Sequence, residues 1–297
     1  GGNTVATGLR VHFRGAAARR FSRDAAARPL GRSAASSVGA GLAHDPGGTC
    51  MVAARFESVG MDRALLGGTF WGSDYGEGAL CFAGPNLVPL SGDAAALGEV
   101  ARALQQRGRQ CASIVGRAEF ALPLWEHLRP SWGPARDVRP DQPLMVCPDP
   151  PALRPDPRVV RVTPDRLDDY YPAAVAMFTE EVGVDPCAGD GGAGYRARVA
   201  ELVAGGRAFA IFDGHTVVFK AEVGALSSAV ALIQGVWVDP RWRGRGIASS
   251  ATAAVVRTVQ RWGRLPSLYV NSHNVAARAA YDRVGFHRAG TFASILF

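Results

Sequence analysis

A short basic loop punctuated by glycines is the part of the sequence best suited to binding an anion. The loop follows the apolar run 229–238 and opens the Ala/Val-rich stretch 247–262. Glycines let the main chain approach an anion closely, and the free N–H groups of a first helical turn point towards it. We therefore predict a pyrophosphate site lined by Arg243, Gly244, Arg245, Gly246, Ile247 and Ala248.

A second group of residues that could take part in catalysis or binding lies in the segment 271–286. Tyr281 carries a phenol with an ordinary pKa of about 10, which can pass a proton to a leaving group. Asn274 stands before the helical pattern 275–284, where asparagine is also a common helix cap. Core packing behind Phe286 is the alternative explanation of Tyr281.

The elements that must position these residues alternate between strand and helix. Residues 147–157 contain five prolines, which exclude helix and central strand and indicate an extended linker. Beyond the linker, the pattern predicts strands at 158–163, 208–212, 216–223, 229–238, 268–270 and 291–297. It predicts helices at 165–182, 195–204, 247–262 and 275–284.

The first half of the chain shows a faint echo of this order. Strands are predicted at 69–71, 79–89, 111–115 and 144–147, and helices at 94–106 and 122–128. The loop that corresponds to the anion cradle is 90–93, which lacks a Gly-x-Gly and carries Asp93. Because an aspartate repels a phosphate, we expect no anion site in this half.

Two motifs in the second half resemble those of the GNAT superfamily of acyl-CoA-dependent N-acyltransferases. The family's acetyl-CoA loop, Gln/Arg-x-x-Gly-x-Gly/Ala, fits with Arg241 or Arg243 as its first residue. The family pattern Asn-x-x-Ala-x-x-x-Tyr-x-x-x-Gly-Phe fits residues 274–286. A glycine loop alone is weak, whereas two motifs in the family's order are specific.

The resemblance covers residues 158–297 and extends loosely to the whole chain. The first half is similar to an uncharacterised, degenerate GNAT-like domain that precedes the active one in a group of bacterial proteins. An α/β fold is thus implied, with two GNAT-like domains in tandem, each a mixed, mostly antiparallel sheet flanked by helices. The predicted division is a basic tail at 1–42, expected to be disordered, a first domain at 43–147, a linker at 148–157 and a catalytic domain at 158–297.

The resemblance also implies the chemistry of the site. Acetyl-CoA is the expected cosubstrate, and its acetyl group would pass directly to a primary amine of a small molecule or peptide through a tetrahedral intermediate. The family's fourth and fifth strands splay apart, and main-chain N–H groups of Val236, Trp237 and Val238 would line that gap. Tyr281 would be the general acid, and Asn274 would contact the cosubstrate.

The general base has several candidates. Some family members carry a glutamate on the fourth strand, where this chain offers only Gln234, which cannot take a proton. The predicted catalytic carboxylates are Glu222 on the third strand and Glu181, beside Glu180, at the end of the first helix. Lys220 shares a strand face with Glu222, so a structural ion pair is an equal explanation of that glutamate. A water relay would need no base.

Composition limits the other functions. The net charge of +7 is concentrated in residues 1–40, which hold seven arginines and one acid. Nucleic-acid binding requires basic residues on a folded face, and a tail of this kind does not favour it. No run is apolar enough for a membrane span. The five dispersed cysteines indicate free thiols, no metal site and a cytoplasmic location, and nothing indicates the oligomeric state.

Two classes of function therefore stand against each other. The first is an N-acetyltransferase, of which a tandem enzyme similar to mycothiol synthase is one variant. The second is a non-catalytic acyl-CoA-binding or sensing protein, which the missing fourth-strand glutamate supports.

Overall fold

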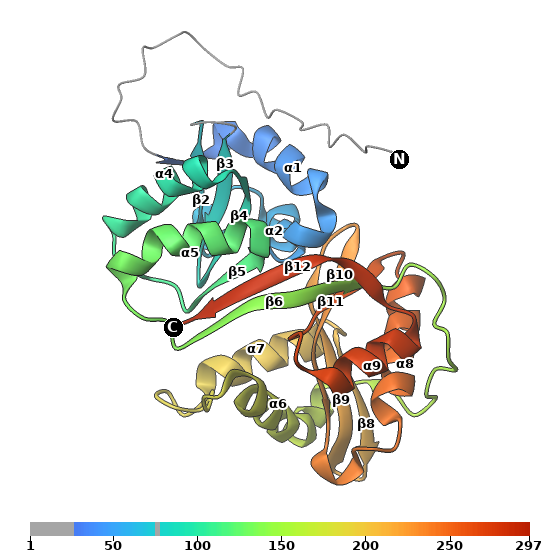
Figure 1. The fold of residues 1–297 in the computed structure, drawn as a ribbon. Helices are drawn as coiled ribbons and strands as arrows, with labels where there is room; N and C mark the ends of the chain where they lie inside the picture. Colours follow the sequence, from blue (N-terminus) through green and yellow to red (C-terminus); the bar gives the residue numbers. More distant parts are fainter. Residues whose placement is uncertain (1–26, 75–77) are drawn as a thin grey trace, which may run out of the picture. The chain divides into compact units, whose positions relative to one another are not determined.

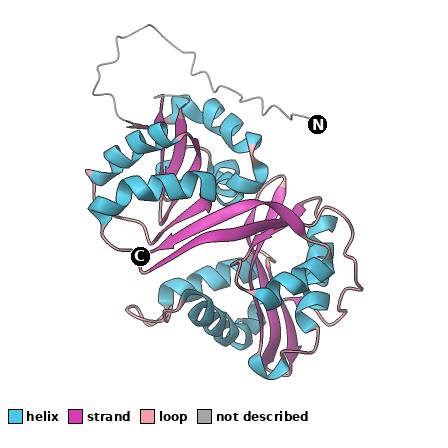
Figure 2. Cartoon of the chain, viewed as in Figure 1, coloured by secondary structure: helices cyan, strands magenta, loops and turns pink. Residues whose placement is uncertain are grey.

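The computed structural model describes residues 27–74 and 78–297, which form two compact units (Figure 1). Unit 1 extends to Asp141 and resumes at Thr291–Phe297, and unit 2 is Gln142–Gly290. In each unit, helices pack on a sheet (Figure 2).

Unit 1 is built on strands that are antiparallel to their neighbours except where β4 and β5 run parallel. In spatial order the strands are β1 (Arg28–Pro29), β2 (Thr69–Ser73), β3 (Ala79–Ala83), β4 (Asn86–Gly92), β5 (Ser113–Arg117) and residues 292–296 of β12 (His287–Leu296). The helices are η1 (Arg32–Ala34), α1 (Ala35–His44), α2 (Pro46–Val59), α3 (Arg63–Leu66), α4 (Ala94–Gln105) and α5 (Ala118–Trp132).

Alternate side chains of the unit 1 strands serve two cores. Trp71 and Cys81 pack with α4 and α5, whereas Phe70 contacts Phe56 of α2 at a ring separation of 6.2 Å. This period of two is what a strand covered on both faces requires.

Unit 2 has the same parts in a similar order. Its strands are residues 144–146 of β6 (Asp137–Val146), then β11 (Leu265–Tyr269), β10 (Val230–Val238), β9 (Thr216–Leu226), β8 (Ala208–Asp213) and β7 (Val160–Arg161). Its helices are η2 (Pro164–Arg166), α6 (Leu167–Val182), α7 (Ala193–Ala204), η3 (Pro240–Trp242), α8 (Ile247–Arg261) and α9 (Val275–Val284). Only β10 and β11 are parallel.

The strand alternation separates the helices of unit 2 into two layers. Ala208 and Ala210 of β8 pack in a cluster with α6 and α7, and Phe209 and Ile211 pack with α8. The sheet is therefore a rigid central layer, and α8 and α6 approach β10 from opposite faces.

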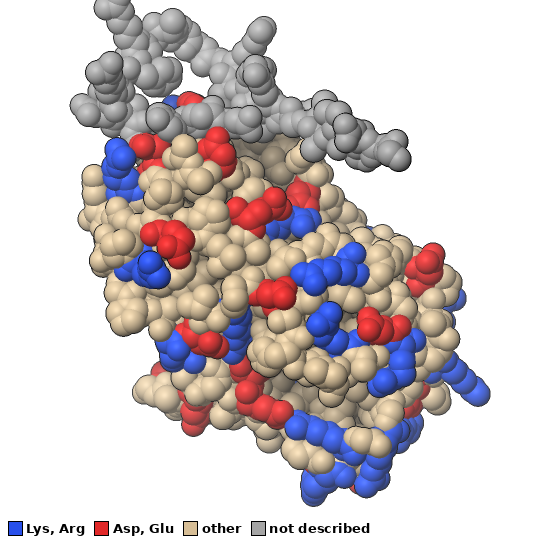
Figure 3. Space-filling view, in the orientation of Figure 1, with Lys and Arg blue, Asp and Glu red and all other residues tan. Residues whose placement is uncertain are grey.

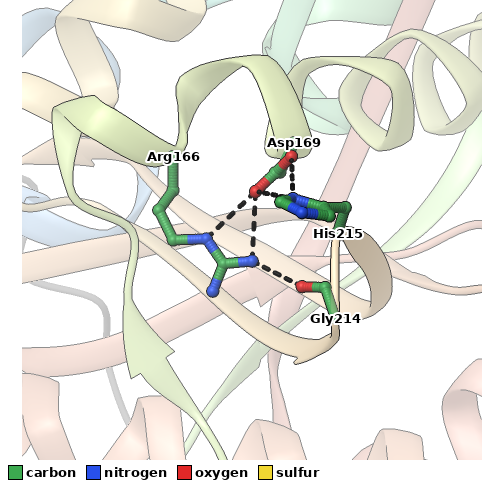
Figure 4. Close-up of polar contacts among 4 residues, drawn as sticks. All are labelled: Arg166, Asp169, Gly214 and His215. Carbon is green, nitrogen blue, oxygen red and sulfur yellow. Dashed lines mark hydrogen bonds and ion pairs between the residues drawn. The ribbon is translucent and has the colours of Figure 1, made fainter.

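A polar cluster fixes the start of α6 to the β8–β9 turn (Figure 4). Arg166 donates to Gly214 O at 2.6 Å and to Asp169 Oδ2 at 3.1 Å, and His215 Nδ1 lies 3.0 Å from Asp169 Oδ1. The hydrogen bond with His215, supported by Arg166, holds the pKa of Asp169 below its usual value. These bonds position the helix that carries Glu180 and Glu181.

The prediction of a disordered tail is wrong for residues 27–42. Arg28 and Pro29 pair with β2, and α1 buries Val38 and Leu42. Residues 1–26 lie outside the described part of the chain. α1 carries serines and glycines, which are weak helix formers, so we attribute much of its stability to the burial of its apolar side chains.

The compact units differ from the predicted domains in two segments. Residues 142–147 pack in unit 2 and residues 291–297 in unit 1. Each segment forms strand pairs with residues more than a hundred positions away, which a local pattern does not reveal. The assignment of a degenerate domain to residues 43–147 and of a catalytic domain to residues 158–297 stays a prediction.

Four of the five cysteines are buried core residues and all five are free. Burial raises the pKa of Cys81 to about 12, which makes its thiol unreactive at neutral pH. Among the described helices, none combines the length and apolar character that crossing a membrane requires.

Candidate functional site

The predicted anion loop lies between β10 and α8 of unit 2. Asp239 caps η3, accepting a bond from the Arg241 main-chain N–H at 2.9 Å. Gly244 and Gly246 have positive φ angles of 78° and 76°, a conformation that costs other residues about 1 kcal/mol. A methyl group added to either glycine would meet no atom within 4 Å. The glycines turn the chain into α8 and leave open space beside it.

The first turn of α8 presents main-chain N–H groups that the protein does not use. Gly246 is the N-cap residue, and no side chain caps the helix. Ser250 is the first to bond along it, with its N–H donating to Gly246 O at 3.4 Å. Within the described residues, the N–H groups of 244–249 have no acceptor. Unused N–H groups at a helix N-terminus are suited to an anion, and we call this group the cradle. Binding of a pyrophosphate there stays a prediction.

The two arginines of the loop are held by neighbouring groups. Arg243 Nε donates to Val238 O at 2.9 Å, and its Nη2 donates to Glu180 Oε2 at 2.9 Å. Arg245 lies over the Trp242 ring, 4.9 Å from its centroid. The hydrogen bond from Arg243 holds the pKa of Glu180 below its usual value. Arg243 is thus shared between the cradle and the end of α6.

The strands that flank the cradle separate beyond their first residues. Residues 230–232 of β10 pair in parallel with 265–267 of β11, and in the described structure no pairing between these two strands follows. The main-chain groups of Val236, Trp237 and Val238 therefore have no β11 partner in the described structure. This separation is the predicted gap.

β10 also contains a bulge at this gap. Gln234 pairs with Glu222 and Trp237 with Lys220, so that Gly235 and Val236 together oppose the single residue 221. Gly235 has a φ of 62°, and its carbonyl oxygen accepts a bond from Lys220 Nζ at 2.8 Å. A glycine within a strand pattern is a known signal for a bulge, and it could have been used to predict this one.

Tyr281 of α9 lies in the same core cluster as Val238, Ile247 and Leu268. Its ring packs against Phe286 with centroids 5.8 Å apart. The hydroxyl group has no hydrogen-bond partner among the described residues. Burial, with a smaller contribution from the charge of Glu181, raises the pKa of Tyr281. The phenol therefore keeps its proton at neutral pH.

The predicted carboxylates lie in different surroundings. Glu222 is buried, and its Oε1 accepts from Tyr170 Oη at 2.6 Å and lies 3.2 Å from Lys220 Nζ. Glu181 is an exposed residue at the end of α6. The structure thus gives Glu222 the ion pair that the sequence left as one explanation. Nothing in the sequence indicated that Tyr170 would donate a hydrogen bond to Glu222.

Asn274 is the N-cap of α9. Its Oδ1 accepts from the Ala277 N–H at 3.2 Å. This bond is the helix-capping role of the residue, and contact with a cosubstrate stays a prediction.

The corresponding place in unit 1 is closed. Asp93 Oδ1 accepts from the Ala96 N–H at 2.8 Å and so occupies the first turn of α4. The last parallel pair of β4 and β5 is Leu87 with Ile114. Two residues further along each strand, Pro89 and Gly116 are still close, because a methyl group on Gly116 would lie 3.0 Å from Pro89 O. α4 therefore lacks the uncapped N-terminus of α8, and β4 and β5 stay close together where β10 and β11 have separated.

The sequence of residues 168–286 matches the model of the acetyltransferase (GNAT) family. This segment belongs to the GNAT family. Acyl transfer from an acyl-CoA is the family's chemistry. Residues 68–170 match a domain of unknown function, DUF4081, and a search of curated proteins finds no match.

Solved structures show the same fold. A Drosophila protein aligns with 91% of this chain and 98% of its own, at 15% identity and a TM-score of 0.59. A GNAT-family acetyltransferase from Colwellia psychrerythraea aligns with 91% of this chain and 99% of its own, at 13% identity and a TM-score of 0.53. The predicted α/β fold, a mixed sheet flanked by helices, is confirmed.

Proposed function

We propose that the protein is an acetyl-CoA-dependent N-acetyltransferase that transfers the acetyl group directly to a primary amine of a small molecule or peptide. The observation that carries the proposal is the separation of β10 and β11 beside a helix N-terminus with unused N–H groups. A pyrophosphate needs the second feature and an extended pantetheine arm needs the first. A cytoplasmic location stays a prediction.

The cradle would hold the pyrophosphate of acetyl-CoA. The N–H groups of Gly244, Gly246 and Ile247 donate to it, and Arg243 and Arg245 add positive charge. Beyond it, the pantetheine arm would lie against the main chain of Val236–Val238. These amides can then stabilise the oxyanion that forms when an amine attacks the thioester.

Tyr281 would act on the departing sulfur. A phenol with a raised pKa is protonated throughout the neutral range, so it can donate a hydrogen bond that strengthens as negative charge develops on the thiolate. Its hydroxyl, which has no hydrogen-bond partner among the described residues, and its place in the core cluster that includes Val238 and Leu268 support this role.

Between the two predicted bases, the surroundings favour Glu181. Glu222 is buried, and its Oε1 is already in contact with Tyr170 Oη and Lys220 Nζ, so an incoming amine has little access to it, whereas Glu181 lies at the surface. The charge of Glu181 acts on Tyr281, so this carboxylate lies within electrostatic range of the proposed acid. We propose Glu181 as the general base for the incoming amine.

An acyl-CoA-binding protein without catalysis is the second candidate. It rests on Gln234, which takes the place of the family's fourth-strand glutamate and whose amide covers Gly224, so that a methyl group there would lie 2.0 Å from Gln234 Cδ. In that case the cradle would bind acetyl-CoA and no amine would be acetylated.

An amine panel separates the two candidates. We expect free thiol to appear when acetyl-CoA is mixed with the protein and polyamines, aminoglycosides, amino acids or peptides, and acetylated amine to appear in equal amount. Thiol release that no amine accelerates, together with tight acetyl-CoA binding, would favour the second candidate. No binding of acetyl-CoA would contradict both.

A further inference from the structure

A buried charged cluster lies under the bulge of β10. Lys220 is the only lysine of the chain and is fully buried. Its Nζ contacts Glu222 Oε1 at 3.2 Å, and the same oxygen accepts from Tyr170 Oη at 2.6 Å. Burying an ammonium group is costly even when it is paired, so a cluster of this kind calls for an explanation.

The third contact of Lys220 is to the main chain. Its Nζ donates to Gly235 O at 2.8 Å. An ion pair between Lys220 and Glu222 does not require this bond, because the two side chains already share one face of β9. The ammonium therefore connects the charged pair to the bulge of β10 at Gly235 and Val236.

The bond fixes the orientation of a whole peptide group. The Gly235–Val236 peptide is planar and trans, so holding its carbonyl towards Lys220 also sets the direction of the Val236 N–H, on the opposite side. Neither Gly235 nor Val236 has a register partner on β9 or β11 within the described structure. The bond from Lys220 therefore supports this peptide at the point where the register between β9 and β10 is interrupted.

Gly235 is shaped for this contact. A methyl group on it would lie 2.7 Å from Lys220 Nζ and 3.1 Å from Met177 Cε. A side chain at this position would displace the ammonium, and its φ of 62° also favours glycine.

We propose that Lys220 is a positioning residue that holds the Gly235–Val236 peptide so that the Val236 N–H meets the thioester carbonyl oxygen. Glu222 neutralises the buried ammonium, and Tyr170 holds the Glu222 carboxylate by donating to its Oε1. The inference rests on the proposed function, because the thioester must lie in the gap beside β10. Lys220 itself touches no reacting atom.

The test compares Glu222→Gln with the double variant Lys220→Met/Glu222→Gln. The single variant keeps an amine that can donate to Gly235 O. The double variant removes this donor, replaces the charged pair by neutral side chains of similar volume and leaves no unpaired carboxylate. The comparison thus isolates Lys220 from any role of Glu222 as a base. Thermal unfolding and circular dichroism verify that both variants are folded.

The decisive readout is the infrared stretch of the thioester carbonyl. Acetyl-CoA isotopically labelled at that carbon is bound to each protein without an amine. A hydrogen bond lowers the stretching frequency, so we expect the lowered band with the natural protein and with Glu222→Gln. The double variant should bind acetyl-CoA within about twofold of the single variant and show a band near its position in water. Its kcat should be lower by about 10- to 100-fold, the usual cost of a misplaced catalytic contact.

The outcomes distinguish this inference from the proposed function. An unchanged lowered band in the folded double variant would overturn the positioning role and leave the acetyltransferase proposal intact. A carbonyl band that is not lowered in the natural protein would contradict the oxyanion contact itself. If acetyl-CoA does not bind to the natural protein, the proposed function fails first.

Discussion

The proposed role of Tyr281 as the general acid can be tested directly by a single substitution. Replacing it with phenylalanine removes only the hydroxyl, and the ring can keep its contact with Phe286. We expect Tyr281→Phe to lower kcat by about 100-fold, as for the loss of an acid catalyst, and to leave the Kd for acetyl-CoA unchanged. Because its pKa is raised, the required protonated form is lost only above the ordinary range of about 10, so Tyr281 should not limit the pH–rate profile of the natural protein between pH of about 6 and 9.

A steady-state measurement with saturating amine verifies this prediction. The role of Tyr281 would be contradicted by a kcat equal to that of the natural protein, or by a loss that appears only in the Kd.

Glu180 competes for an arginine that the cosubstrate would also use. Its bond to Arg243 joins two half-exposed side chains, an arrangement worth about 1 kcal/mol at most. We expect Glu180→Gln to free Arg243 for the pyrophosphate and to tighten acetyl-CoA binding by about two- to fivefold. Calorimetry at low and high salt measures the effect, which should shrink as salt screens the charges.

The control for this prediction is the same substitution in an Arg243→Gln background. There, Glu180→Gln has no arginine to release, so the gain should disappear. A gain that persists in that background would show that Glu180 acts on binding by another route.

At the scale of elements, the glycine loop and the end of α8 provide a matched pair of variants. Gly244 and Gly263 have φ angles of 78° and 74°, and a methyl group on either would meet no atom within 4 Å. Gly263 follows the last turn of α8, about 20 Å from the cradle along the helix. Gly244→Glu should abolish acetyl-CoA binding, because it places a carboxylate in the cradle. Gly263→Glu should cost similar stability, about 1 kcal/mol, and leave binding intact.

Calorimetry and thermal unfolding of both variants decide the matter. Equal binding by the two variants would show that the loop does not hold the cosubstrate.

The elements that sequence alone predicts best are those whose signal is local. The loop 243–248 and α9 follow from glycines, a cap and a helical repeat. α2 was missed although Asp45 caps it and Pro46 opens it, which is a recognisable start. Residues 144–146 of β6 pair with β11, and residues 292–296 of β12 pair with β5. These pairings, like the contacts of Tyr170, join residues that are far apart in the chain, which a single sequence does not reveal. The same limit kept the surroundings of Glu222 hidden.

At the scale of the whole molecule, the two units predict one cosubstrate per chain. Asp93 occupies the first turn of α4, and β4 stays against β5 at Pro89. We expect calorimetry to give a stoichiometry of one acetyl-CoA per chain. Asp93→Ala should cost about 1 kcal/mol of stability by removing the cap, and it should not create a second site because the strands remain closed. Two equivalents bound to the natural protein would contradict this reading of unit 1.

Acidic and basic side chains both lie on the surface, and the expected absence of a nucleic-acid partner stays a prediction. Figure 3 shows both Lys/Arg and Asp/Glu side chains on the face in view, with several basic side chains close together towards its lower right. Several arginines are also paired with acids, among them Arg117 with Asp45 and Arg158 with Asp156. A binding surface for phosphates would require unpaired basic groups gathered on one face.

The pairing of β5 with residues 292–296 constrains the order in which the two units can fold during synthesis. When β5 leaves the ribosome, the strand that lies against Ser113–Arg117 has not yet been made, because 174 residues separate Arg117 from Phe292 in the chain. The edge of β5 and the core that Ala293 and Ile295 complete stay open while all of unit 2 is translated. Unit 2, whose β6 segment precedes its other strands, can close its sheet before that moment. The domain translated first is therefore the one that matures last.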